Sequence, residues 1–157
     1  MTTVHDLPPV PLGLRERFVE LALLKVDSVV LWNRDGPDVF DCSGLVAWCI
    51  LKAGGPDLRA THNAQKLFDE TAGPWSIEPR PGDLAFYGAD IKRITHVAIW
   101  LGPERVLSAD GATSRVTDLA KAQANPAARV HLHTRPYRRD FFALHQNKWL
   151  DVEPVCR

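Results

Sequence analysis

The chain has 157 residues, of which 45% are hydrophobic and 24% are charged, a composition typical of one globular domain and not of a disordered or fibrous protein. Nineteen basic residues balance nineteen acidic ones, so the charge does not indicate a nucleic-acid or anionic-membrane partner. The longest apolar run, Leu45–Leu51, is far shorter than the roughly 20 residues that cross a membrane.

The first half of the chain is predicted to be mainly helical. The proline-rich residues 1–12 are expected to form an extended lead-in. Apolar side chains recur at helical spacing over residues 13–26 and again over residues 61–72. Between these two segments, Asp41 is a typical N-cap, an apolar block follows it, and Gly54-Gly55-Pro56 is a typical helix stop.

The second half of the chain is predicted to consist mainly of strands. Short apolar segments bounded by turn residues indicate strands at 84–87, 95–101, 105–109 and 129–133. Helices first and an antiparallel meander afterwards predict an α+β fold, with one helical layer on one sheet. We therefore expect a single domain over residues 13–145, followed by a C-terminal tail over residues 146–157.

Cys42 is the residue that most clearly indicates chemistry. It follows the N-cap, so its sulfur lies at a helix N-terminus, where free N–H groups and the helix dipole favour a thiolate and lower the pKa of the thiol. Gly44 is expected to leave space beside the sulfur for a substrate backbone. Cys49 is interpreted as core packing, because about 10.5 Å of helix separates it from Cys42 and excludes a disulfide between them.

A thiolate nucleophile needs a base within hydrogen-bonding reach, and His96 is the best candidate among the six histidines. His96 lies at the start of the predicted strand 95–101, which has the strongest apolar strand pattern in the chain. Depending on where the following turn lies, His96 is opposite Asp110 with Ser108 as its diagonal neighbour, or opposite Ser108. In both registers a polar side chain shares its face and can orient the imidazole.

No pattern in the sequence predicts a metal ion or a cofactor. His131 and His133 share one face of a predicted strand, but spacing identifies no third ligand, so we interpret them as polar edge-strand residues. The phosphate-binding patterns GxxxxGK[ST] and GxGxxG are absent.

Three segments resemble, in order and at normal separations, the signatures of the NlpC-type cell-wall peptidases: Phe40-Asp41-Cys42-Ser43-Gly44-Leu45-Val46, Arg80-Pro81-Gly82-Asp83-Leu84-Ala85-Phe86 and Thr95-His96-Val97-Ala98-Ile99-Trp100-Leu101-Gly102. The resemblance extends from about residue 14 to about residue 143. It implies a papain-like fold and a cysteine peptidase that cleaves peptidoglycan stem peptides, typically between D-glutamate and the following diamino acid.

The same resemblance implies a role for each matching residue. Cys42 would be the nucleophile, with its backbone N–H contributing to the oxyanion site, and His96 would be the general base. Asp41 and Ser43 would line the cleft and bind the carboxylate and amine side of the D-glutamate. No metal or other cofactor is implied.

Two positions depart from the family pattern. The family's third polar residue, often histidine, corresponds here to Ser108, so the third catalytic group is left open between Ser108, Asp110 and a backbone carbonyl. Trp32 matches an aromatic residue of a block that precedes the nucleophile, and we expect it to contact substrate. Val30 stands where that block has a substrate-contacting tyrosine, so the substrate preference can differ.

Two other functions are kept as alternatives: a papain-like amidase or acyltransferase with a non-wall substrate, and a non-catalytic wall-binding or virion subunit. The first residues lack the basic and apolar regions of a secretory signal. We therefore expect a protein that is cytoplasmic as synthesised and acts on the bacterial wall as a phage lysin, virion component or delivered toxin. Its expected partner is the peptidoglycan stem peptide, and its oligomeric state is left open.

Overall fold

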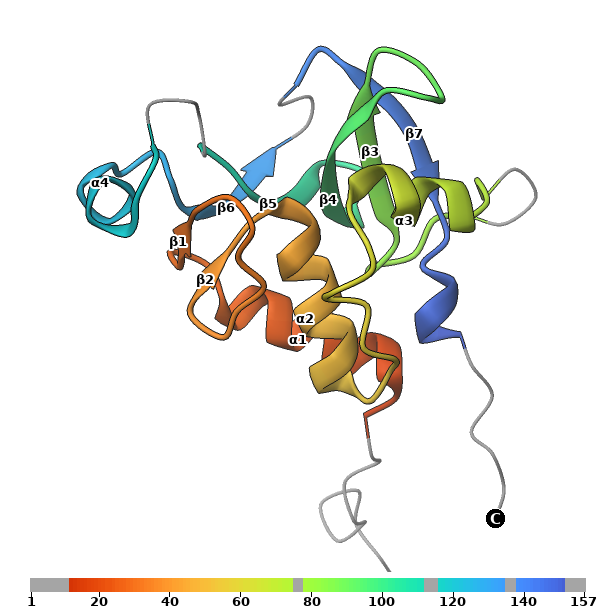
Figure 1. Cartoon of the computed structure of the whole chain (residues 1–157). Coiled ribbons are helices and arrows are strands. Elements are labelled where there is room, and N and C mark those ends of the chain that lie inside the picture. Colours follow the sequence, from red (N-terminus) through yellow and green to blue (C-terminus); the bar gives the residue numbers. More distant parts are fainter. Residues whose placement is uncertain (1–11, 75–77, 112–115, 135–137, 152–157) are drawn as a thin grey trace, which may run out of the picture.

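Helices cover one face of an antiparallel sheet in the computed structural model, which describes residues 12–74, 78–111, 116–134 and 138–151 (Figure 1). The expected lead-in over residues 1–12 lies almost entirely outside these ranges. The helices are α1 (Leu14–Leu24), α2 (Cys42–Ala53), α3 (Ala64–Glu70), α4 (Leu119–Ala124) and the 3-10 helix η2 (Lys148–Leu150). None of the helices in these ranges has the length and apolar character needed to span a membrane.

The main sheet has five strands in the order β6-β5-β4-β3-β7, and all neighbouring pairs are antiparallel. The strands are β3 (Leu84–Gly88), β4 (Ile94–Gly102), β5 (Arg105–Ala109), β6 (Val130–Thr134) and β7 (Phe141–His145). A separate parallel pair joins β1 (Val29–Val30) to β2 (Val39–Phe40), directly before α2. The expected α+β architecture is confirmed, and β7 is a strand that sequence patterns did not indicate.

The two faces of the sheet differ in what they contact. On one face, inward residues such as Phe86, Ile99 and Leu107 join the large core with Phe18 of α1 and Ile50 of α2. On the other face, a smaller apolar cluster contains Ala85, Tyr87, Ala98, Trp100 and Val106. Because side chains alternate along a strand, His96 belongs to this second face, next to Val97, which belongs to the first.

Helix α2 lies within the core because its sequence is apolar around most of its circumference. It starts where Asp41, with extended backbone, accepts a hydrogen bond from the Gly44 N–H at 2.6 Å. It ends at Gly54, whose φ of 116° is the left-handed conformation that favours glycine at a helix C-terminus. The predicted start and stop of this helix are therefore confirmed.

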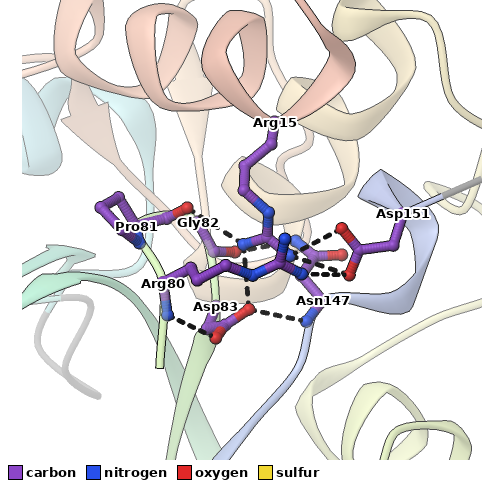
Figure 2. Close-up of polar contacts among 7 residues, drawn as sticks. All are labelled: Arg15, Arg80, Pro81, Gly82, Asp83, Asn147 and Asp151. Carbon is purple, nitrogen blue, oxygen red and sulfur yellow. Dashed lines mark hydrogen bonds and ion pairs between the residues drawn. The ribbon is translucent and has the colours of Figure 1, made fainter. Parts of the chain in front are cut away.

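A buried ion pair joins three distant parts of the chain (Figure 2). Asp83, which is 0% exposed at the start of β3, accepts hydrogen bonds from Arg15 of α1 at 2.9 Å and from the Arg80 and Asn147 backbone N–H groups. Arg15 also binds the Asp151 carboxylate. The helix α1, the turn before β3 and the C-terminal segment are thus held together at one carboxylate.

The expected boundary at residue 145 falls short of the packed structure. Asn147 is fully buried, and Trp149 and Leu150 pack in the main core. Burying these apolar side chains makes residues 147–150 part of the domain and not of a tail.

Candidate active site

Cys42 is the first residue of α2, and its side chain is half-buried at the wall of a cavity. Burial raises the pKa of its thiol to about 11, and the nearby Asp41 carboxylate acts in the same direction. Backbone hydrogen bonds from Val97, Ser43 and Cys42 itself oppose the rise but do not cancel it. The expectation of a lowered thiol pKa is therefore wrong, because the loss of solvation outweighs the effect of the helix N-terminus.

The contact between Cys42 and the Val97 backbone places the sulfur against β4, one residue away from His96. His96 is 7% exposed and lines the same cavity as Cys42. Its ring packs against that of Tyr87, the residue paired with it on β3, with 5.6 Å between the ring centroids. The structure therefore brings the predicted nucleophile and the predicted base to one site.

A chain of hydrogen bonds orients the His96 ring. The Nε2 atom lies 2.6 Å from the Ser108 hydroxyl, and that hydroxyl donates its proton to Asp110 Oδ1 at 2.8 Å. A hydroxyl has one proton to donate, so Ser108 accepts from His96, and Nε2 carries the ring proton. The lone pair is then on Nδ1, the nitrogen that a general base uses in this tautomer.

The register of β4 and β5 brings both side-chain candidates for the third catalytic group, Ser108 and Asp110, near His96. Ile99 pairs with Leu107 and Trp100 with Val106, a register that places His96 opposite Asp110 and diagonal to Ser108 when it is continued. The first of the two registers considered from sequence is thus the observed one. Ser108 contacts the imidazole directly, whereas Asp110 Oδ1 is 3.5 Å from Nε2 and acts mainly through the serine.

The His96 imidazole is held neutral. Burial lowers its pKa to about 4, and the positive charge of Arg138 adds to this effect, while the carboxylates of Asp110 and Asp140 oppose it. With the thiol pKa near 11 and the imidazole pKa near 4, the resting site contains a neutral thiol and a neutral imidazole.

The cavity has a volume of about 1000 Å³ and collects most of the predicted site residues. Its lining includes Asp41, Cys42, Ser43, His96, Asp110 and the exposed Trp32. Ser108 lies behind this lining, 1% exposed. Three arginines that the sequence analysis did not single out also line it: Arg34, Arg59 and Arg138. They come from separate segments, and no spacing in the sequence signals that they meet.

Gly44 lines the cavity beside Cys42 and also permits a close approach of the preceding loop. A Cβ atom at this position would lie 2.0 Å from the Arg34 carbonyl oxygen and 2.8 Å from Asp41 Oδ1. That carbonyl also accepts the Asp41 N–H at 2.7 Å. The position of a Cβ on residue 44 is therefore filled by the backbone of the preceding loop, while the Gly44 backbone lines the cavity together with Cys42.

Asp41 combines its capping role with a place in the cavity wall. Its Oδ1 accepts from the Gly44 N–H and from the Ser43 hydroxyl, the latter at 3.3 Å. Burial raises the pKa of this carboxyl, although these hydrogen bonds act against the rise. The side chains of Asp41 and Ser43 are thus held in a fixed relation beside the sulfur.

The structure also brings a third side chain of ligand type, which spacing did not identify, to His131 and His133. Asp110 lies with them, and one ligand atom from each residue lies within 4.8 Å of the others. The two histidines are polar residues of the edge strand β6, as interpreted, and Asp110 reaches them from the end of the adjacent strand β5.

Comparisons with known proteins identify the family of this chain. A model of the NlpC/P60 family matches residues 30–138. The bifunctional muramidase/DL-endopeptidase CwlT of Bacillus subtilis is 35% identical over 91 residues, which are 56% of this chain and 27% of that protein. The probable endopeptidase p60 of Listeria monocytogenes is 36% identical over 80 residues, 50% of this chain and 15% of that protein. The chain thus spans about a quarter or less of these relatives.

Solved structures share the fold. NlpC1 from Trichomonas vaginalis aligns with a TM-score of 0.62 at 19% identity, covering 90% of this chain and 46% of that one. RipD of Mycobacterium tuberculosis, described as a non-catalytic NlpC/p60 domain protein adapted to peptidoglycan binding, aligns with a TM-score of 0.56 at 15% identity. The alignment covers 87% of this chain and 98% of the RipD chain. The family model spans most of the chain, including the cysteine, the histidine and the serine described above, and this chain therefore belongs to the NlpC/P60 family.

Proposed function

We propose that this domain is a cysteine peptidase that hydrolyses peptidoglycan stem peptides, at the bond between D-glutamate and the following diamino acid, and that it acts at the bacterial cell wall. The observation that carries the proposal is the cavity in which Cys42, at the start of α2, and His96, oriented through Ser108 and Asp110, both line the wall. A nucleophile with an oriented base is the arrangement that covalent acyl transfer requires.

The neutral resting pair determines how the first step proceeds. His96 Nδ1 takes the thiol proton as the Cys42 sulfur attacks the scissile carbonyl carbon, so the imidazole becomes charged only during the attack. The new carbon–sulfur bond moves the carbonyl electron pair onto oxygen, and the Cys42 backbone N–H at the helix start stabilises that oxyanion. Ser108 and the Asp110 carboxylate stabilise the imidazolium through Nε2.

The second half of the reaction reverses these proton transfers. The carbon–nitrogen bond breaks, His96 gives its proton to the leaving amine, and an acyl-enzyme thioester remains on Cys42. His96 then takes a proton from water as the water attacks the thioester carbon. The carbon–sulfur bond breaks, His96 returns its proton to the sulfur, and the carboxylic acid leaves. Asp41 and Ser43 would bind the polar groups of the D-glutamate, which their hydrogen bond to each other and their place in the cavity lining support, and Trp32 lines the same cavity.

Purified sacculi provide the test. We expect the wild-type protein to release new amino groups and shortened stem peptides, identified by mass spectrometry. Cys42→Ala should lose this activity completely, whereas Cys49→Ala, a matched change in the same helix but inside the core, should retain it. Ser108→Ala should lower kcat by about 100-fold, the lower end of the range that general acid–base catalysis contributes.

Three results would contradict the proposal. Hydrolysis by Cys42→Ala at the wild-type rate would exclude the thiol as nucleophile. Turnover of a simple acyl ester without any release from sacculi would favour an amidase or acyltransferase with another substrate. Binding of the folded wild-type protein to sacculi without any product would indicate a non-catalytic binding domain, the role described for RipD.

A further inference from the structure

A second cluster of ligand-type side chains lies on the same face of the sheet as His96, at the edge strand β6. His131 and His133 are two residues apart on β6, so both point to one face, and their ring centroids are 5.6 Å apart. Asp110 follows β5, the strand paired with β6. The three residues thus come from two neighbouring strands whose register is set by five residue pairs.

The distances within this cluster suit a small metal ion. Asp110 Oδ2 is hydrogen-bonded to His133 Nε2 and lies 3.7 Å from His131 Nδ1, and the three ligand atoms are all within 4.8 Å of one another. In a tetrahedral site with metal–ligand bonds near 2.0 Å, neighbouring ligand atoms are about 3.3 Å apart. Small side-chain movements would therefore bring all three atoms to one ion.

The partial exposure of the three side chains leaves the cluster accessible to an ion and to a further ligand from solvent. The side chains of His131, His133 and Asp110 are 34%, 27% and 18% exposed, so the cluster is partly desolvated and still reached from solvent. Two imidazole nitrogens and one carboxylate oxygen are ligands that favour zinc and similar transition metals over magnesium or calcium, which take mainly oxygen ligands.

We propose that Asp110, His131 and His133 form a binding site for one divalent transition-metal ion of the zinc type, with the fourth position taken by water or by a ligand. Asp110 is the residue that connects this proposed metal site to His96, through Ser108. Its Oδ2 points to the two histidines, while its Oδ1 accepts from Ser108, which holds His96. Metal binding therefore does not require the hydrogen bonds from Asp110 through Ser108 to the His96 imidazole to break. The metal proposal does not depend on the proposed hydrolysis.

Cobalt binding gives a test that is independent of activity. The full-length protein, treated with a chelator and dialysed, is titrated with Co²⁺ under anaerobic conditions, and visible absorption and calorimetry are recorded. We expect one equivalent to bind with weak visible bands and without the intense near-ultraviolet band of a thiolate ligand. Zn²⁺ should displace it, and the melting temperature should rise with the metal.

Matched variants locate the ion. His131→Ala and His133→Ala should each weaken binding by more than about tenfold, which is the smallest loss expected even for a residue that only supports a ligand. Glutamine at either position is the second variant if alanine impairs folding, which circular dichroism monitors. Cys42→Ala serves as the control and should bind Co²⁺ like the wild-type protein, because the thiol belongs to the other part of the cavity wall.

Two outcomes would overturn the proposal. If Cys42→Ala abolishes binding while the two histidine variants retain it, the ion binds at the catalytic thiol. If the wild-type protein binds no Co²⁺ or Zn²⁺ at millimolar concentration, then Asp110 and His133 form a hydrogen-bonded pair only.

Discussion

At the scale of single residues, burial decides the protonation of the proposed catalytic pair, Cys42 and His96. The Cys42 thiol and the His96 imidazole both lose solvation, and for each group this favours the uncharged form. A helix N-terminus favours a thiolate, but this contribution is limited to the few N–H groups of the first turn. In the proposed mechanism, the proton is therefore transferred during the attack, and no charged pair is stored at rest.

Alkylation of Cys42 by iodoacetamide tests this conclusion. With a thiol pKa of about 11, the thiolate fraction, and with it the alkylation rate, should rise about tenfold per pH unit between pH 6 and pH 9. His96→Ala should change the rate at pH 7 little, since no ion pair is lost. The rate is followed by mass spectrometry of the Cys42 peptide in chelator-containing buffer, and the buried Cys49 is the internal control that should react only after unfolding.

A different pH profile would contradict the neutral pair. A rate that is already constant below pH 7, and that falls sharply in His96→Ala, would show a resting thiolate stabilised by an imidazolium. The mechanism would then begin from a preformed nucleophile.

At the scale of elements, the start of α2 is fixed by the loop that precedes it. The Arg34 carbonyl accepts the Asp41 N–H and lies where a side chain of residue 44 would begin. The Asp41 carboxylate caps the same turn from the other side. The position of Cys42, the proposed nucleophile, thus depends on a close approach between loop and helix that only glycine permits.

Gly44→Ala should therefore destabilise the protein. Alanine improves helix propensity by up to about 1 kcal/mol, but its Cβ would lie 2.0 Å from a backbone oxygen that cannot move without breaking the cap. We expect a net loss of about 1–3 kcal/mol in the free energy of unfolding, typical of overpacking, measured by urea denaturation. Gly102→Ala is the matched control, because no heavy atom lies within 4 Å of its Cβ position.

The stability of Gly44→Ala relative to Gly102→Ala tests whether the Arg34 carbonyl leaves room for a Cβ at residue 44. If Gly44→Ala were as stable as the wild-type protein, helix propensity would outweigh the close contact, and the loop would be free to shift.

At the scale of the whole molecule, Asp83 connects the helical layer to the sheet. Its carboxylate is buried and is balanced by the Arg15 guanidinium from α1 and by two backbone N–H groups (Figure 2). A buried pair of this kind adds little net energy, but removal of one partner leaves an uncompensated charge in the interior.

Arg15→Ala should consequently cost about 3 kcal/mol in the free energy of unfolding, the lower end of the range for breaking a buried pair. The measurement is urea denaturation followed by circular dichroism at pH 7. Arg93→Ala, which removes the exposed partner of Asp90, is the control and should leave the midpoint unchanged. Equal midpoints for the two variants would show that Asp83 is satisfied by its backbone donors alone.

Local patterns predicted much of this protein. The N-cap Asp41, the apolar block and the glycine stop define α2, and they place Cys42 at its start, because capping and periodicity act over a few neighbouring residues. The hairpin of β4 and β5 follows from alternation and a turn, so His96, Ser108 and Asp110 were expected to share one face.

Only the tertiary structure decided how these pieces work together. It selected the strand register in which His96 lies opposite Asp110 and diagonal to Ser108, brought three arginines into the cavity, and added Asp110 to the two histidines of β6. It also reversed the expected shift of the Cys42 thiol pKa. Solvation and close contact depend on atoms from segments far apart in the chain, and local sequence patterns contain no information about which of those atoms will meet.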